Sequence, residues 1–75
     1  GQNAMIAGMV AQLDAKLEAD GSDRDGWIKL MRSYQVLGQR ANAEDALVRA
    51  RKAMASSPEG LAAINAAAQE LGLGN

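Results

Sequence analysis

The sequence lacks both cysteine and histidine. Without cysteine there is neither a disulfide nor a thiolate metal site. Without histidine there is no haem ligation through imidazole, most zinc sites are excluded, and the usual base that activates a nucleophile is missing. No glycine-rich loop could cradle a phosphate, and residues 21–32 have calcium-loop spacing without its two essential acids. We therefore expect no enzymatic activity, no metal site and no cofactor.

Excess charge and long apolar runs are also missing. The 8 Lys and Arg residues are opposed by 9 Asp and Glu residues, so the net charge is −1. This balance gives no basic excess to attract nucleic acid, and no apolar run approaches the ~20 residues that a membrane span requires. We expect neither nucleic-acid binding nor membrane contact by this segment.

The chain is short but rich in apolar residues. Its 75 residues allow one domain, and an apolar content of 48% is too high for a disordered tail. A domain of this size buries only ~60% of its unfolded surface, so it is marginal unless it packs against a partner or more chain. We expect a single domain over residues 1–75, excised from a longer protein.

Aromatic residues are scarce, and their positions define the predicted core. Trp27 and Tyr34 are the only two, and with Leu30 they follow the spacing i, i+3, i+7 on one face of a helix. Gly38 follows the last apolar residue and is predicted to adopt the left-handed conformation that ends a helix.

Cap residues and apolar spacing predict four helices and no strand. The predicted caps and spans are Asn3 before a helix to about Ala19, Ser22 or Asp23 before 24–37, Asn42 before a helix to about Ala55, and Ser57 before 58–71, which Gly72 and Gly74 end. Four methionines at core spacings are expected to fill the core: Met5, Met9, Met31 and Met54. Short links predict an all-α antiparallel four-helix stack of α-hairpins.

The sequence also repeats itself. The spacing of Trp27, Leu30 and Tyr34 recurs after a 37-residue interval, as Ile64, Ala67 and Leu71, and a 34-residue interval separates Leu13 from Leu47. This pattern predicts half a repeat, one full hairpin and a capping half repeat, in which stacking supplies the core.

The central hairpin resembles a tetratricopeptide repeat (TPR). The TPR pattern of large and small residues is met at six positions, namely Trp27, Leu30, Tyr34, Ala43, Leu47 and Ala50. The sequence departs from the family at Met31, where a glycine is usual, at Leu47, where phenylalanine is usual, and at Pro58, which arrives three residues late. The larger Met31 side chain is expected to affect how closely the hairpin packs.

A narrower resemblance covers nearly the whole chain. The segments 5–13, 26–38 and 67–73 are similar to the TPR-like periplasmic portion of the CcmI/CycH family of cytochrome c maturation proteins. The resemblance implies a chaperone in the periplasm, part of a membrane-anchored protein, that holds haem-free apocytochrome c, often by its C-terminal helix, and delivers it to the haem ligation complex. The composition by itself fits the cytoplasm equally well.

In TPR arrays the first helix of each hairpin lines a groove that suits a partner's helix or extended segment. The residues at these offsets, which we predict to bind a partner, are Asp25, Ile28, Arg32, Gln35, Asn65 and Gln69. Two of them have a plainer interpretation, since Ile28 could complete the edge of the core and Arg32 could be a solvated surface charge.

Two alternative functions remain open. One is a generic TPR scaffold with another client. The other is a helix-turn-helix that binds DNA through the basic cluster Arg40, Arg49, Arg51 and Lys52, although a solvated convex face explains those cations better.

Overall fold

The computed structural model describes residues 2–73, which form four α-helices. They are α1 (Gln2–Ala19), α2 (Arg24–Val36), α3 (Arg40–Ala53) and α4 (Pro58–Glu70). No strand occurs within residues 2–73. The prediction of an all-α four-helix stack, TPR-like in its arrangement, is confirmed.

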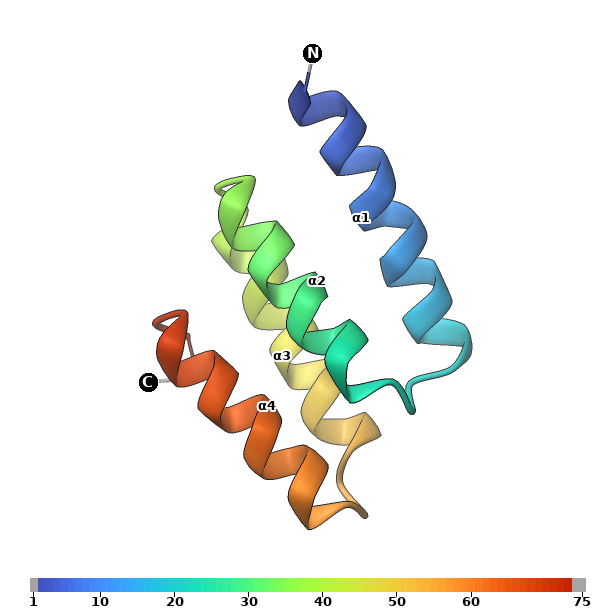
Figure 1. Ribbon diagram of the computed structural model, residues 1–75, viewed down its shortest axis with the longest axis vertical. Helices are drawn as coiled ribbons and strands as arrows, with labels where there is room; N and C mark the ends of the chain where they lie inside the picture. Colours follow the sequence, from blue (N-terminus) through green and yellow to red (C-terminus); the bar gives the residue numbers. More distant parts are fainter. Residues whose placement is uncertain (1, 74–75) are drawn as a thin grey trace.

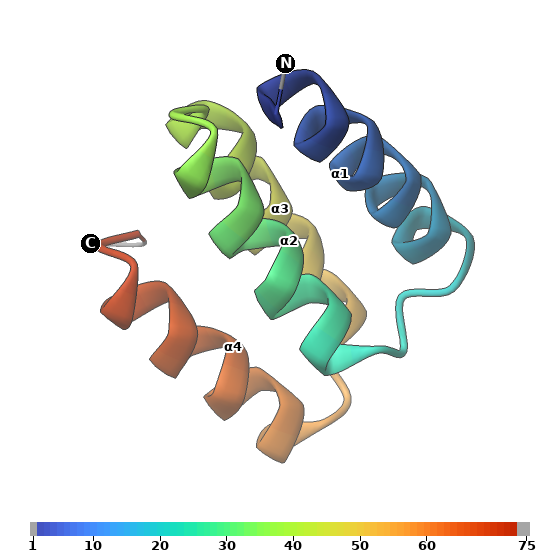
Figure 2. The same ribbon diagram turned by 45° about the horizontal axis from the view of Figure 1, so that its top comes forward.

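Helix α2 lies at the centre of the molecule. It packs against α1, α3 and α4, and α3 also packs against α4. Helices α1 and α4 flank α2 on opposite sides with α3 behind it, and α2 and α4 run in the same direction (Figures 1 and 2). The result is a flat stack of 39 × 27 × 15 Å.

The starts of α2 and α4 are fixed by side-chain caps that the sequence predicts. Asp23 accepts a hydrogen bond from the backbone N–H of Gly26 at 3.1 Å, and Ser57 accepts one from Gly60 at 3.2 Å. Each bond satisfies one of the unpaired donors in the first helical turn. Both predicted caps, Asp23 and Ser57, are therefore confirmed.

Two other predicted caps are wrong. Helix α1 already includes Gln2, so Asn3 lies inside it. Helix α3 begins at Arg40, because the N–H of Ala43 donates to the carbonyl of Gln39 at 3.1 Å and helical bonding has already started there. The Asn42 side chain donates to the Gln39 side chain at 2.9 Å instead of capping the backbone.

Helices α2 and α4 end in the same way. A glycine with positive φ follows each C-cap, at 73° for Gly38 and 74° for Gly72. The residue after each glycine donates its N–H to the carbonyl five residues earlier. Gln39 donates to Tyr34 at 2.9 Å, and Leu73 donates to Ala68 at 2.7 Å. This is the Schellman motif. Gly74 lies outside the described residues.

These matching ends follow a 34-residue interval, which separates the cap Asp23 from Ser57 and the terminal glycine Gly38 from Gly72. The 37-residue interval is therefore wrong as the structural register, although the 34-residue interval from Leu13 to Leu47 agrees with it. In the correct register Trp27 corresponds to Leu61. The 37-residue match followed large side chains, whereas caps and positive-φ glycines determine where each helix begins and ends.

The core forms around α2. Trp27 is 2% exposed, and its indole N–H donates to the carbonyl of Gly21 at 2.9 Å. Met31 is fully buried in place of the expected glycine, so the hairpin packs around this larger side chain. The assignment of Met5 and Met9 to the core is wrong: they are 72% and 63% exposed, because the backbone of α1 lies close to that of α2 alone among the described helices.

Candidate functional site

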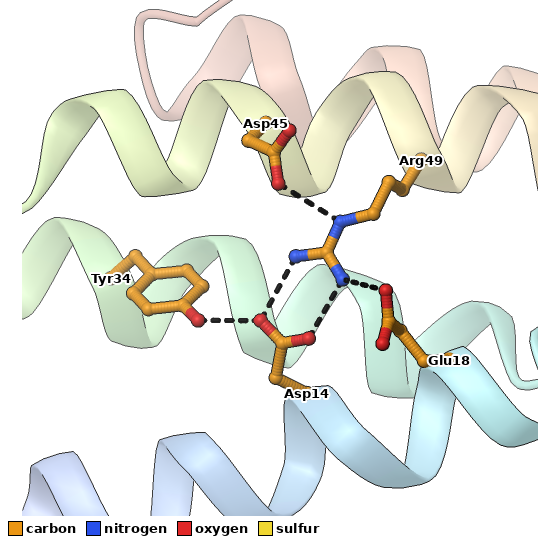
Figure 3. Close-up of polar contacts among 5 residues, drawn as sticks. All are labelled: Asp14, Glu18, Tyr34, Asp45 and Arg49. Atoms are coloured by element: carbon orange, nitrogen blue, oxygen red, sulfur yellow. Dashed lines mark hydrogen bonds and ion pairs between the residues drawn. The ribbon is translucent and has the colours of Figure 1, made fainter.

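A polar cluster centred on Arg49 joins three helices. The guanidinium of Arg49 on α3 donates to both carboxylate oxygens of Asp14 on α1, at 2.7 and 2.9 Å. The hydroxyl of Tyr34 on α2 donates to the same carboxylate at 2.6 Å (Figure 3). The guanidinium carbon also lies 5.5 Å from the ring centroid of Trp27, within range of a cation–π contact.

Two further acids surround Arg49. Its nitrogens lie 3.8 Å from Glu18 and 3.0 Å from Asp45, which is four residues earlier on α3. The Nε–H of Arg49 is buried and forms no well-directed hydrogen bond with the described residues, so Asp45 acts mainly through its charge. One half-buried cation is therefore held among three carboxylates.

The ion pair changes the proton affinity of its members. The hydrogen bond from Arg49 holds the pKa of Asp14 below its ordinary value, and it raises the pKa of Arg49 in turn. Burial, followed by the hydrogen bond to Asp14, raises the pKa of Tyr34 to about 12. At neutral pH the cluster therefore contains a carboxylate, a neutral phenol and a guanidinium that satisfy one another.

The cluster holds α1 in place on the stack. Because α1 packs against α2 and has no backbone contact with α3, the Asp14–Arg49 pair links the two helices across α2. We assign this cluster a positioning role rather than a binding role. Sequence reasoning missed it because Asp14 lies off the apolar stripe and 35 residues from its partner. The only local sign in the sequence that Arg49 forms ion pairs is Asp45, four residues earlier on the same helix.

The predicted binding residues of α2 share one face of that helix but differ in exposure. Asp25 and Arg32 are exposed, seven residues apart on the solvent face. Ile28 and Gln35 lie towards α4: Ile28 packs against the core, and the amide of Gln35 donates to the carbonyl of Leu71 at 2.6 Å. The structure therefore brings Ile28 and Gln35 into the contact between two helices.

The predicted binding residues of α4 lie elsewhere, beside α3. Asn65 accepts a hydrogen bond from Arg51 at 2.8 Å, and Gln69 lines the same open hollow of about 370 Å³. In the 34-residue register, Asn65 corresponds to the buried Met31 and not to Ile28. The six predicted residues thus lie on one face of α2 and at a hollow beside α4, and their role in binding stays a prediction.

The basic cluster is largely engaged within the domain. Arg40 pairs with Glu44 at 3.0 Å and donates to the carbonyl of Gly72 at 2.8 Å. Arg51 bonds to Asn65, and Arg49 is held by Asp14. The interpretation of these cations as a solvated convex face is therefore incomplete, since three of the four side chains bond to other parts of the domain.

No group of three acidic side chains within residues 2–73 has the geometry to hold a metal ion. In the same range, no helix combines the length and apolarity needed to cross a bilayer.

The chain is similar to two curated bacterial proteins. It is 39% identical over 72 residues to the cytochrome c-type biogenesis protein CycH of Bradyrhizobium diazoefficiens. It is 42% identical over 72 residues to the protein of the same name from Rhizobium meliloti. Each alignment includes 96% of this chain but only 20% or 19% of the relative, so the chain spans about a fifth of their length. No protein-family model and no solved structure matches it.

Proposed function

We propose that this chain is a protein-binding module of cytochrome c biogenesis that catalyses no reaction. The observation that carries the proposal is about 40% identity, over nearly all of the chain, to two proteins named for that process. The proposed client is haem-free apocytochrome c, held by a helical segment and passed to the haem ligation complex. The proposed setting is the periplasm, as part of a longer protein.

The outward face of α2 offers a surface for this task. Asp25 and Arg32 are exposed on it, and Val36, four residues after Arg32, is an apolar side chain with 70% exposure. Arg32 forms no ion pair with the described residues, so it is available to a partner's carboxylate or to the C-terminal end of a partner's helix. The face is small, so we expect weak binding by this domain alone.

The chemistry of the domain supports a binding role over catalysis. Among the described residues, four side chains have shifted pKa values. Three of them, Asp14, Tyr34 and Arg49, bond to one another, and the fourth, Asp20, accepts hydrogen bonds from Ser22. A catalytic acid or base would instead need free access to a substrate.

The test is a titration of the ¹⁵N-labelled chain with a synthetic peptide of an apocytochrome c C-terminal helix. We expect chemical-shift changes centred on Arg32 and Val36. The substitution Arg32→Glu should weaken binding about threefold or more, as expected for an exposed charge contact. Lys52→Glu, at an exposed position on α3, is the matched control and should have no effect.

Two outcomes would contradict the proposal. Absence of binding at millimolar peptide would remove apocytochrome c as the client. Binding that Arg32→Glu and Lys52→Glu weaken equally would mean that the peptide responds to net charge and not to the face of α2.

A further inference from the structure

Two cations of the chain, Arg49 and Arg51, are half-buried, and they differ in what surrounds them. Arg49 lies among three carboxylates. Arg51, two residues further along α3, forms no ion pair with the residues that the structure describes. Its Nε–H donates instead to the neutral amide oxygen of Asn65 on α4, at 2.8 Å. Removing a charge from water is costly unless an opposite charge accompanies it. Arg51 therefore lacks the counter-charge that Arg49 has.

Arg51 lines an open hollow between α3 and α4. The hollow has a volume of about 370 Å³, within the size range of small-ligand sites. The side-chain amides of Asn65 and Gln69, one turn apart on α4, lie along it together with small alanines and the buried Leu73. While Asn65 holds Nε, the two Nη nitrogens of Arg51 form no hydrogen bond with the described residues. These nitrogens offer the planar pair of donors that binds both oxygens of a carboxylate.

The 34-residue register shows that this hollow is polar where the equivalent place in the stack is apolar. Arg51 corresponds to Leu17, and Asn65 corresponds to Met31. Leu17 and Met31 are 2% and 0% exposed in the hydrophobic core. A guanidinium and an amide at these positions would lose their hydrogen bonds to water under an apolar helix. The hollow therefore suits an anionic occupant that forms hydrogen bonds, and not a further apolar helix.

The position of Arg51 near the end of α3 does not by itself explain this arrangement. The last turn of a helix favours a cation, because the carbonyl groups there carry partial negative charge. Lys52 is in the same turn and stays exposed to water. The dipole of α3 is therefore met by Lys52 without any need to place a second cation, half-buried, beside the amides of α4.

We propose that this hollow binds the C-terminal carboxylate of an extended peptide. The carboxylate pairs with the Nη nitrogens of Arg51, and the amides of Asn65 and Gln69 bond to the last peptide groups. A small aliphatic side chain at the end of the peptide packs against the alanines and Leu73. A chain end places a carboxylate next to a peptide group, which matches a guanidinium next to an amide. This site is separate from the outward face of α2 and does not depend on the cytochrome c client.

The test uses three N-acetylated tripeptides. The first is Ala-Ala-Leu with a free carboxylate, the second is the same peptide with a C-terminal amide, and the third is amidated Ala-Glu-Leu. We expect the ¹⁵N-labelled chain to bind the free acid at least about tenfold more tightly than either amidated peptide, because a charged hydrogen-bonded pair forms. The shift changes should lie at the side-chain amides of Asn65 and Gln69 and at the Nε–H of Arg51.

Variants of Arg51 separate recognition from folding. Arg51→Gln should weaken binding of the free acid about tenfold and leave binding of the amide unchanged, whereas a folding defect would weaken both. Arg51→Lys keeps the charge but not the planar pair of donors, so the loss should be about threefold. Lys16→Gln is the matched control, because it removes an exposed charge from α1, which flanks α2 on the side opposite α4 (Figures 1 and 2). It should leave the affinity of both peptides unchanged.

Several results would overturn the proposal. Equal affinity for the free acid and its amide would remove the carboxylate from recognition, and absence of binding by the free acid at millimolar concentration would remove the site. Equal binding of the amidated glutamate peptide would assign the hollow to an acidic side chain. Inorganic phosphate that reproduces the same shifts at the same concentration would reduce it to a general anion site. A C-terminally amidated apocytochrome c peptide, followed at Arg32 and Val36, fails or succeeds independently of these results.

Discussion

Helices α2 and α4 are built alike at both ends but differ in what surrounds them. Each begins with a capping side chain and ends in a Schellman motif, with a positive-φ glycine at the equivalent position, Gly38 or Gly72. Between these ends α2 packs against three helices, whereas α4 packs against two. Trp27 is buried, but its counterpart Leu61 is only partly buried.

This comparison separates two physical contributions. The ends of a helix are set by local hydrogen bonds, which Asp23, Ser57 and the two glycines provide from within a few residues. The free energy that holds a helix in a fold comes mainly from the apolar surface that its neighbours cover. Equal caps therefore give equal helices, and unequal surroundings give unequal stability.

The largest expected effect contrasts the equivalent residues of the two helices. Trp27→Ala should lower the free energy of unfolding by about 3–5 kcal/mol, because it removes a buried indole and the bond to Gly21. That loss approaches the total stability expected for a domain of this size, ~4–11 kcal/mol. Leu61→Ala should cost about 1–2 kcal/mol, since that side chain is only partly covered. Urea unfolding followed by circular dichroism measures both.

The milder variant Trp27→Phe keeps this test usable if Trp27→Ala does not fold. Equal losses in the free energy of unfolding at positions 27 and 61 would mean that α4 is as well covered in solution as α2. They would contradict the difference between the two helices.

The next effect concerns the Arg49 cluster, which the α4 side of the stack lacks, since Asp14 corresponds to the exposed Val48. Arg49→Leu should cost about 2 kcal/mol at pH 7, because it leaves the half-buried Asp14 without its cation. Arg24→Leu is the control and should cost less than about 0.5 kcal/mol, since its pair with Asp25 is exposed.

This contribution depends on pH in a definite direction. The pKa of Asp14 is lower in the folded chain than its ordinary value of 3.8, so the stabilisation is fully present above that pH. It is lost as the pH falls further, when the folded chain must also take up the proton. The gap in stability between the wild type and Arg49→Leu should therefore close below about pH 4. A gap that stays constant down to pH 2 would show that packing, and not charge, accounts for it.

The smallest effect tests whether the two helix ends are truly equivalent. Gly38→Ala and Gly72→Ala should each cost about 1 kcal/mol, because alanine is strained at positive φ. Apart from the glycine and its two chain neighbours, no atom lies within 4 Å of the added Cβ at either site, so backbone strain is what the substitution measures. A loss at Gly38 without one at Gly72 would show that the end of α4 contributes little to the folded state.

Much of the fold could be predicted from local chemistry. Helix number, the caps Asp23 and Ser57, the turn at Gly38 and the burial of Trp27 all depend on side chains within a few residues or on one helical face. The Asn42 cap was wrong for a reason that spacing cannot reveal. The Schellman motif ends at Gln39, and α3 starts at the next residue, Arg40, two residues before Asn42, which has the better cap chemistry.

The rest depended on contacts between distant segments. Leu73 is buried because the motif at Gly72 turns the chain back onto the stack, and no periodicity includes it. The Asp14–Arg49 pair unites residues that each look like surface charges. The residues predicted to line one binding groove do not form one surface, for the same kind of reason. Its α4 members were chosen in the 37-residue register, and in the structural register Asn65 corresponds to a buried core position.

The 34-residue register makes residues 24–57 a self-joining module. Ser57 can cap a helix that begins with Arg24 as readily as one that begins with Pro58, because these are the first residues of the equivalent helices α2 and α4. A tandem duplication of that stretch should therefore lengthen the helical stack by one hairpin. The second copy of α2 would follow Ser57 and pack where α4 packs now. The free energy of unfolding of such a protein should rise by a similar amount with each copy added, as in a one-dimensional array.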